Sequence, residues 1–199
     1  MTRLLLLRHA AHDLAGRALA GRLPGLGLNA LGRQQAQALV EPLLRQSVQV
    51  VCASPQQRAR ETALPLANRL GVEVAVAPEF DEIDFGEWTG QEFGQVRDRH
   101  PGLWDGWVHR RSQATPPGGE PFARVAERVQ AGVQRLAREH PDEVVLVASH
   151  ADVIKATLAT HLGLSLDRLE GFEIACGSLS VLEVGAQGSQ VKLVNGVYF

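Results

Sequence analysis

The chain has 199 residues, of which 45% are hydrophobic and 21% are charged, and its formal net charge is −2. This composition is typical of an ordinary globular protein, and it excludes a collagen, a coiled coil and a disordered chain. A protein that binds nucleic acid without regard to sequence usually carries a strong basic excess, so we expect no nucleic-acid partner.

Short apolar runs predict six strands, because strands buried on both faces are apolar throughout. The run at 144–148 is the clearest of them, whereas residues 72–77 alternate only weakly. In chain order, the expected strands are 4–7, 48–53, 72–77, 144–148, 178–184 and 191–197.

Helical spacing and end signals predict four helices between these strands. The first follows Asn29, which is a good N-cap residue, and Pro42 should end or kink it. Within this helix we expect three apolar side chains to face inward, those of Leu31, Ala38 and Leu39.

The second helix is expected to begin at Ser54-Pro55, because serine caps helices and proline fits their first turn. Gly71 is a C-terminal stop for it, and Pro65 favours a kink inside it. The other two helices are expected at 121–140 and at 151–162, where Gly163 ends the last one.

Strands that alternate with helices predict an α/β fold, a three-layer α/β/α sandwich around a mainly parallel sheet. Residues 80–120 are the least regular part and hold all three tryptophans, Trp88, Trp104 and Trp107. We expect this segment to form a small irregular cap over one end of the sheet, inserted in a single domain that spans residues 1–199.

Two features bear on cellular location. The two cysteines, Cys52 and Cys176, match neither a disulfide framework nor a metal-binding spacing. The apolar run at 4–7 is too short for a signal peptide or a membrane span. We therefore expect a cytoplasmic protein without a membrane partner, and we leave its oligomeric state open.

Charged residues follow three of the expected strands. The first strand ends in Arg8 and His9, Arg58 lies one helical turn after Ser54, and His150 follows the clearest strand. Ligands of such folds bind beyond the carboxyl ends of the strands. Each residue alone is more often a surface or capping residue, but together two arginines and two histidines indicate a site for an anion such as phosphate.

Four stretches, in this order along the chain, resemble the signature motifs of the histidine phosphatase superfamily, also called phosphoglycerate mutase-like. One such motif is weak evidence, whereas four in order are specific. The stretches are Leu4–Ala10, which contains Arg8-His9-Ala10, Ala53–Ala63, which contains Arg58, Glu82–Gly90, and Val147–His150.

The resemblance implies a phosphatase of the histidine acid type that acts on a small phosphorylated metabolite and needs neither a cofactor nor a metal. His9 matches the nucleophile that accepts the phosphoryl group. Arg8, Arg58 and His150 match the pocket that binds and neutralises this group. Glu82 matches the general acid that later activates water, a dual role that requires a raised pKa.

The chain departs from the family pattern around these positions. Ala10 replaces the glycine after the first histidine, and Ala151-Asp152 replaces the common Gly-Gly after the second. His12 stands where many members have a threonine that binds phosphate, and Arg22 lies in a loop without the usual aspartate. We expect His12 and Arg22 to bind substrate as well, although His12 could simply pack and Arg22 could be a solvated loop residue.

A mutase is the nearest alternative to a phosphatase. Phosphoglycerate mutases carry an Arg-His-Tyr-Gly run after the catalytic glutamate, whereas Glu82 is followed by Ile83, Asp84 and Phe85, with no basic residue. We therefore favour the phosphatase branch and a phosphomonoesterase, with α-ribazole phosphatase and sugar-phosphate phosphatase as candidate activities.

Two other classes of protein remain open. A metal-dependent hydrolase would use His9, His12, Asp13 and His150, a spacing that fits no metal motif we can name. A phosphate-binding module without turnover is suggested by the departures after the two histidines, such as Ala10.

Overall fold

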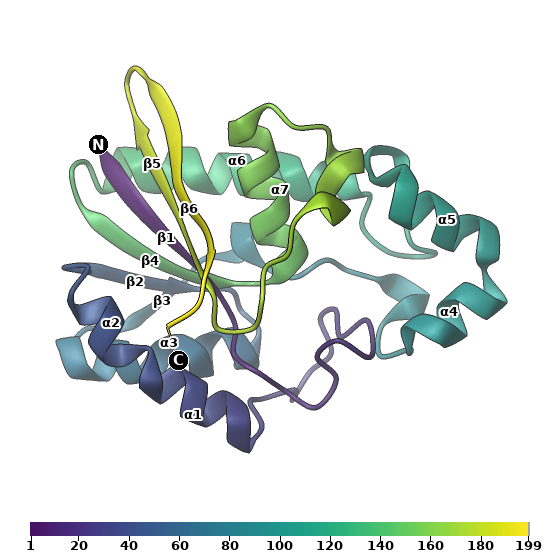
Figure 1. Cartoon of the computed structure of the whole chain (residues 1–199), viewed down its shortest axis with the longest axis horizontal. Helices are drawn as coiled ribbons and strands as arrows, with labels where there is room; N and C mark the ends of the chain where they lie inside the picture. Colours follow the sequence, from purple (N-terminus) through teal and green to yellow (C-terminus); the bar gives the residue numbers. More distant parts are fainter. Residues whose placement is uncertain (199) are drawn as a thin grey trace.

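The computed structural model describes residues 1–198, which form a six-stranded sheet flanked by helices (Figure 1). The strands are β1 Thr2–Arg8, β2 Val50–Ala53, β3 Val74–Val76, β4 Val144–Ser149, β5 Leu179–Gly185 and β6 Gly188–Gly196. Their order in the sheet is β3-β2-β4-β1-β5-β6. The first four strands are parallel, β5 is antiparallel to β1, and β6 is antiparallel to β5. The mainly parallel sheet is thus confirmed.

Helices cover both faces of the sheet because the central strand is apolar on both sides. Leu5 and Leu7 of β1 pack with residues of α2 (Val40–Leu44) and α3 (Gln57–Leu70). Leu4 and Leu6 pack with residues of α6 (Phe122–Glu139) and α7 (Ala151–Leu162). Successive side chains of a strand point to opposite faces, so one run of four leucines serves two helical layers. The α-helices are α1 Ala30–Ala38, α2 Val40–Leu44, α3 Gln57–Leu70, α4 Phe93–Arg99, α5 Pro101–His109, α6 Phe122–Glu139 and α7 Ala151–Leu162.

The first helix differs from its expected form. Asn29 caps α1 as predicted, since its side chain accepts a hydrogen bond from the Gly32 amide at 2.9 Å. Leu31 and Ala38 are exposed, however, and only Leu39 is buried. The inward face of α1 is formed by small residues instead, because the helix approaches the backbone of the loop after β1 closely.

The second helix begins later than expected. Its N-cap is Gln56, so Ser54 and Pro55 precede α3 rather than start it. The helix continues through Pro65 and ends at Gly71, whose φ of 71° is the left-handed conformation that glycine adopts readily. Ser54 is thereby free to bond elsewhere.

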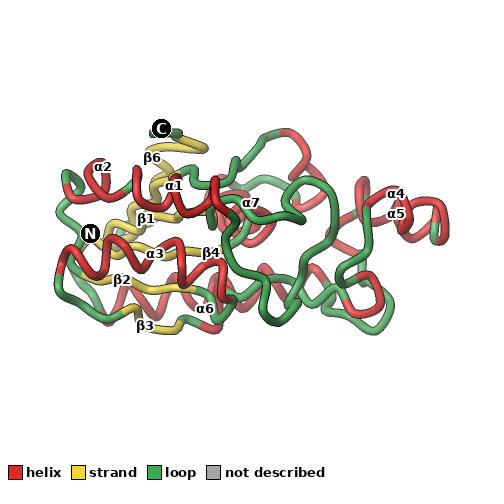
Figure 2. The backbone as a smooth tube through the Cα atoms, turned by 90° about the horizontal axis from the view of Figure 1, so that it is seen from below, coloured by secondary structure: helices red, strands yellow, loops and turns green. Residues whose placement is uncertain are grey.

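The segment 80–120 is more regular than expected, because it contains α4 and α5. Both helices are short, and Gly94, Gly102 and Gly106 interrupt their apolar spacing, so no periodic signal marks them in the sequence. Both lie beyond one end of the sheet (Figure 2). Short 3-10 helices complete the chain at Pro78–Phe80, Gly86–Trp88, Arg111–Gln113 and Leu166–Gly171.

An aromatic cluster joins this segment to the core. The ring of Trp107 lies 5.3 Å from that of Phe85 and 5.7 Å from that of Phe122, measured between centroids, and both contacts are edge-on. Such geometry favours aromatic pairs, and all three side chains are buried. Within residues 1–198, no helix is long and apolar enough to cross a membrane.

Candidate active site

The parallel strands bring the expected site residues to one edge of the sheet. β1 and β4 end level, since Arg8 lies opposite Ser149 in their register. His9 and His150 therefore leave the sheet side by side, and their ring centroids are 5.2 Å apart. Arg58 reaches the same place from the first turn of α3.

His9 is held as a neutral imidazole with one free nitrogen. Its Nδ1 lies 2.9 Å from the carbonyl oxygen of Ala10, and because a carbonyl only accepts, Nδ1 carries the proton. Its Nε2 consequently keeps a lone pair. Burial holds the pKa of His9 well below its usual value, and the positive charges of Arg58 and Arg8 add to this effect.

The two arginines present unused donors to the same place. Arg58 is fully buried, and although its Nη2 donates to the carbonyl of Gly21 at 2.8 Å, its Nε and Nη1 have no partner among the described residues. Arg8 donates through Nη1 to the carbonyl of Ile174 at 2.5 Å, and its Nε likewise lacks a partner within residues 1–198. Buried donors left unsatisfied cost about 1–3 kcal/mol each, so this arrangement indicates an anionic ligand.

The remaining histidines are oriented by their neighbours. Nδ1 of His150 lies 3.3 Å from Nη2 of Arg58, which can only donate, so Nε2 of His150 carries the proton and donates to Oγ of Ser54 at 2.8 Å. His12 accepts the Leu14 amide at Nδ1, which leaves its Nε2–H as a donor. Burial lowers the pKa of His12 to about 4 and that of His150 well below its usual value, so both are neutral near pH 7.

Glu82 faces this cluster from the loop after the first 3-10 helix. Its Oε2 lies 3.3 Å from Nδ1 of His150 and 3.5 Å from Nη2 of Arg58, and its Oε1 accepts the Ile83 amide at 3.0 Å. Burial raises the pKa of Glu82 to about 7, even though the positive charge of Arg58 opposes that shift. Near neutral pH this carboxyl group therefore exists in both protonation states.

Arg22 does not line the cavity with these residues. Its Nε donates to the carbonyl oxygen of Glu82 at 2.9 Å, and its Nη2 donates to Glu120 at 3.1 Å. Arg22 thus supports the loop that carries Glu82 rather than reaching the cavity.

Several residues of the site carry no signal in the sequence. Asp81 accepts hydrogen bonds from Oγ of Ser54 and from the Glu82 amide, so it ties the glutamate loop to the end of β2. Arg128 of α6 donates to the carbonyl oxygen of Glu82 at 3.3 Å. An aspartate beside the glutamate and an arginine on a helix face are common surface residues, and only the fold brings them together.

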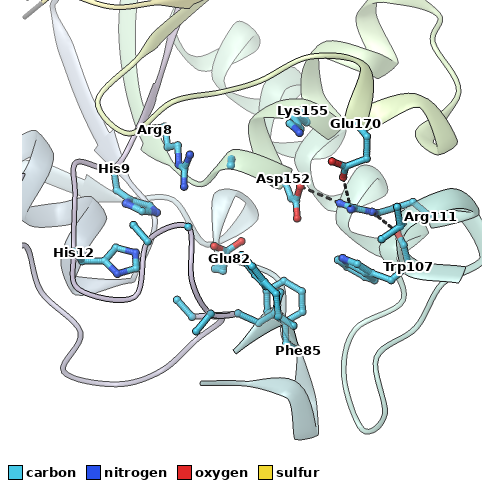
Figure 3. Close-up of a pocket in the computed structure, with 18 of the residues that line it drawn as sticks. Arg8, His9, His12, Glu82, Phe85, Trp107, Arg111, Asp152, Lys155 and Glu170 are labelled. Carbon is cyan, nitrogen blue, oxygen red and sulfur yellow. Dashed lines mark hydrogen bonds and ion pairs between the residues drawn. The ribbon is translucent and has the colours of Figure 1, made fainter. Parts of the chain in front are cut away.

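The cavity in front of His9 has a volume of about 370 Å³. One end is lined by Arg8, His9 and His12, and the other is enclosed by the 80–120 segment, α7 and the last 3-10 helix (Figure 3). The side chains that line this second end include Phe85, Trp104, Trp107, Arg111, Asp152, Lys155 and Glu170.

One set of side chains in the described chain could also hold a metal. Ligand atoms of His9, Glu82 and His150 lie within 4.8 Å of one another. Asp13, a member of the metal site considered from the sequence, is exposed and accepts a hydrogen bond from Asn29 instead. The three side chains that lie together, His9, Glu82 and His150, therefore differ from the four considered from the sequence, which were His9, His12, Asp13 and His150.

Comparison with known proteins identifies relatives across the whole chain. The family model of the histidine phosphatase superfamily (branch 1) matches residues 4–196. The chain is 29% identical over 198 residues to phosphoserine phosphatase 1 of Hydrogenobacter thermophilus, which covers 98% of this chain and 92% of that one. A solved structure of mycobacterial glucosyl-3-phosphoglycerate phosphatase with VO3 superposes with a TM-score of 0.88 at 29% identity, over 98% of each chain.

A bifunctional protein of Mycobacterium tuberculosis is 38% identical over 196 residues, which make up 98% of this chain and 54% of that protein. The chain thus spans about half the length of this curated relative. The family match over residues 4–196 includes the positions of Arg8, His9, Arg58 and His150, and the chain belongs to the histidine phosphatase superfamily, branch 1.

Proposed function

We propose that this protein hydrolyses phosphomonoesters of small metabolites through a phosphohistidine at His9. The observation that carries this proposal is a neutral imidazole whose free Nε2 shares a site with buried guanidinium donors of Arg8 and Arg58 that lack partners within residues 1–198. A neutral imidazole is a nucleophile, and the guanidinium groups stabilise charge on the transferring phosphoryl group.

In the first step, Nε2 of His9 attacks phosphorus and the bond between phosphorus and the ester oxygen breaks. The departing alkoxide takes the proton of the Glu82 carboxyl group. Arg8 and Arg58 balance the charge of the three phosphoryl oxygens, and the Nε2–H of neutral His12 donates a hydrogen bond to one of them.

In the second step, the ionised Glu82 takes a proton from water as the water oxygen attacks phosphorus. The bond between phosphorus and nitrogen breaks, which frees inorganic phosphate and restores neutral His9. A pKa of about 7 suits Glu82 to both steps, because donor and acceptor forms are each populated near neutral pH.

The named relatives support a small metabolite as substrate, since the two phosphatases reported above act on phosphoserine and on glucosyl-3-phosphoglycerate by name. Within that class, α-ribazole phosphate and sugar phosphates remain candidates. We also propose that the reaction is of the acid-phosphatase type and needs no metal, that the chain acts as one domain with residues 80–120 as its cap, and that it works in the cytoplasm.

Trapping the covalent intermediate tests this function. Wild type quenched in alkali after brief exposure to a labelled substrate should retain label on His9, and His9→Ala should retain none and lose kcat by several orders of magnitude. His109→Ala, which changes an exposed histidine, is the matched control and should keep wild-type turnover. Wild-type turnover by the His9→Ala variant would refute the mechanism.

A further inference from the structure

The second end of the cavity contains a cluster of charges that the proposed chemistry does not use. Asp152 and Lys155 lie on one face of α7, and Arg111 and Glu170 face them from the two neighbouring 3-10 helices (Figure 3). All four line the cavity. A substrate whose phosphoryl group sits at His9 would place its alcohol portion among them.

Three of these four charges already have partners. Nη1 of Arg111 lies 3.0 Å from a carboxylate oxygen of Asp152, and Nη2 donates to Glu170 at 2.7 Å. Nε of Arg111 donates to the carbonyl of Trp107 at 2.8 Å, whereas Nη1 pairs with Asp152 as an ion pair without a hydrogen bond. The single positive charge of Arg111 is thus shared between two carboxylates, and both Asp152 and Glu170 are engaged with this buried cation.

Lys155 is different. No carboxylate of residues 1–198 lies within ion-pair distance of its ammonium group. The ammonium nitrogen lies 5.8 Å from the centroid of the Phe172 ring. That ring lies near the outer limit for a cation–π contact and supplies no counter-charge. A lysine that lines a cavity without a counter-ion is a point charge available to a bound anion.

We propose that Lys155 recognises an anionic group on the alcohol portion of the substrate. The substrate class is then a phosphomonoester that carries a second negative group, either a carboxylate or another phosphoryl group. Lys155 lies five residues after His150, the N-cap of α7, which corresponds to about 7.5 Å along the helix axis. A chain of a few carbon atoms spans that distance, so a small metabolite can contact both ends. This inference rests on the proposed phosphatase function.

Matched pairs of substrates test the proposal. O-phosphoserine and O-phosphoethanolamine differ by one carboxylate, and fructose 1,6-bisphosphate and fructose 1-phosphate differ by one phosphoryl group. For each pair, kcat/KM is measured for wild type and for Lys155→Met, Lys155→Arg and Lys192→Met. Lys192 is the chain's other lysine and lies on β6, where it pairs with Glu183 at 3.9 Å.

Wild type should prefer the more anionic member of at least one pair. Lys155→Met should lower that preference about tenfold, since hydrogen bonds to charged groups contribute more than neutral ones. Lys155→Arg should restore most of the preference, and Lys192→Met should leave it at the wild-type value. The pair that responds identifies the anion as a carboxylate or a phosphoryl group.

Two results would overturn the assignment while the phosphatase function stands. One is hydrolysis by wild type without preference for the anionic member of either pair. The other is an equal loss on both members of each pair in Lys155→Met. If wild type releases phosphate neither from these four esters nor from p-nitrophenyl phosphate, the proposed function fails. The proposed role of Lys155 then fails with it.

Discussion

At the scale of single residues, Glu82 has the most demanding environment. It lies beside Arg58, which favours the carboxylate, yet burial raises its pKa to about 7. The desolvation cost therefore exceeds the attraction between the two charges. A solvated surface carboxylate lacks this desolvation, so the raised pKa is consistent with the proton-donor role proposed for Glu82.

The pH dependence of turnover should report this group. Loss of an alkoxide requires protonated Glu82, so kcat/KM for an alkyl phosphate should fall as pH rises through about 7. The p-nitrophenolate ion leaves without a proton, so the first step with p-nitrophenyl phosphate should show little of this loss. Rapid mixing with both substrates over a range of pH measures the difference.

Glu82→Gln separates the two roles of this residue. The variant should lose most of its activity on alkyl phosphates, yet it should still release a burst of p-nitrophenol before slow turnover, because glutamine cannot activate water. Glu87→Gln, in the same acidic stretch, is the matched control. Near-wild-type steady-state rates for Glu82→Gln on both substrates would show that the proton donor lies elsewhere.

At the scale of helices and strands, close packing places the histidine loop. A Cβ atom at Gly32 of α1 would collide with the carbonyl oxygen of Ala11, which lies between His9 and His12. Gly32→Ala should therefore displace this loop and lower kcat by at least tenfold, while Gly106→Ala should be neutral or slightly stabilising, because nothing lies within 4 Å of its Cβ position. Enzyme assays and thermal unfolding of both variants provide the comparison; equal activity of the two would contradict this role for Gly32.

Arg111 connects the second end of the cavity to the core. The side chain is buried between Asp152 of α7 and Glu170. Arg111→Met should therefore lower the free energy of unfolding by about 2 kcal/mol. This loss is smaller than for a fully buried ion pair, because both carboxylates are partly exposed.

The same change should alter catalysis. Asp152 raises the pKa of Glu82, and its charge would act more strongly without Arg111, so the alkaline limb of the pH profile should move to higher pH. Urea unfolding and pH profiles check both effects. Arg110→Met removes an exposed neighbouring arginine and should change neither. An unshifted profile in Arg111→Met would disprove this coupling.

The sequence predicts the strands and helices that a local apolar pattern marks. All six strands and the helices at 122–139 and 151–162 are found near their expected positions, because short apolar runs mark the strands and regular apolar spacing marks these two helices. The start of α3 was predicted wrongly, since Ser54 forms a better N-cap in isolation than Gln56 but is bonded to His150 in the fold.

The site shows the same division between local and distant information. The residues at strand ends and motifs, such as His9 and Arg58, could be located from the sequence because the fold class brings those ends together. Arg111 and Lys155 could not, because their neighbours lie far away along the chain: Arg111 bonds Glu170 across 59 residues. A pattern read over one helix or strand contains no information on such contacts.

At the scale of the whole molecule, the chain has a net charge of −2, and the cavity is lined by three basic and three acidic residues, so its positive charge is local to the end near His9. At that end Arg8 lines the cavity, Arg58 lies buried beside it, and the histidines are neutral near pH 7. This field favours a phosphate dianion and disfavours a divalent cation at the nearby cluster of His9, Glu82 and His150, although those ligand atoms lie close enough together to bind one.

The change in thermal stability on ligand addition distinguishes binding of a phosphate-like anion from binding of a divalent cation. Vanadate at about 100 times its dissociation constant should stabilise the fold by about 2.7 kcal/mol, which raises Tm by roughly 5–10 °C in a chain of this size. Zinc should give a smaller shift and inhibit, because it would occupy the lone pair of His9 and meet two guanidinium charges. EDTA should leave turnover unchanged. Activity that disappears in EDTA and returns with a divalent ion would instead assign the chemistry to a metal held by His9, Glu82 and His150, with the arginines binding the substrate beside it.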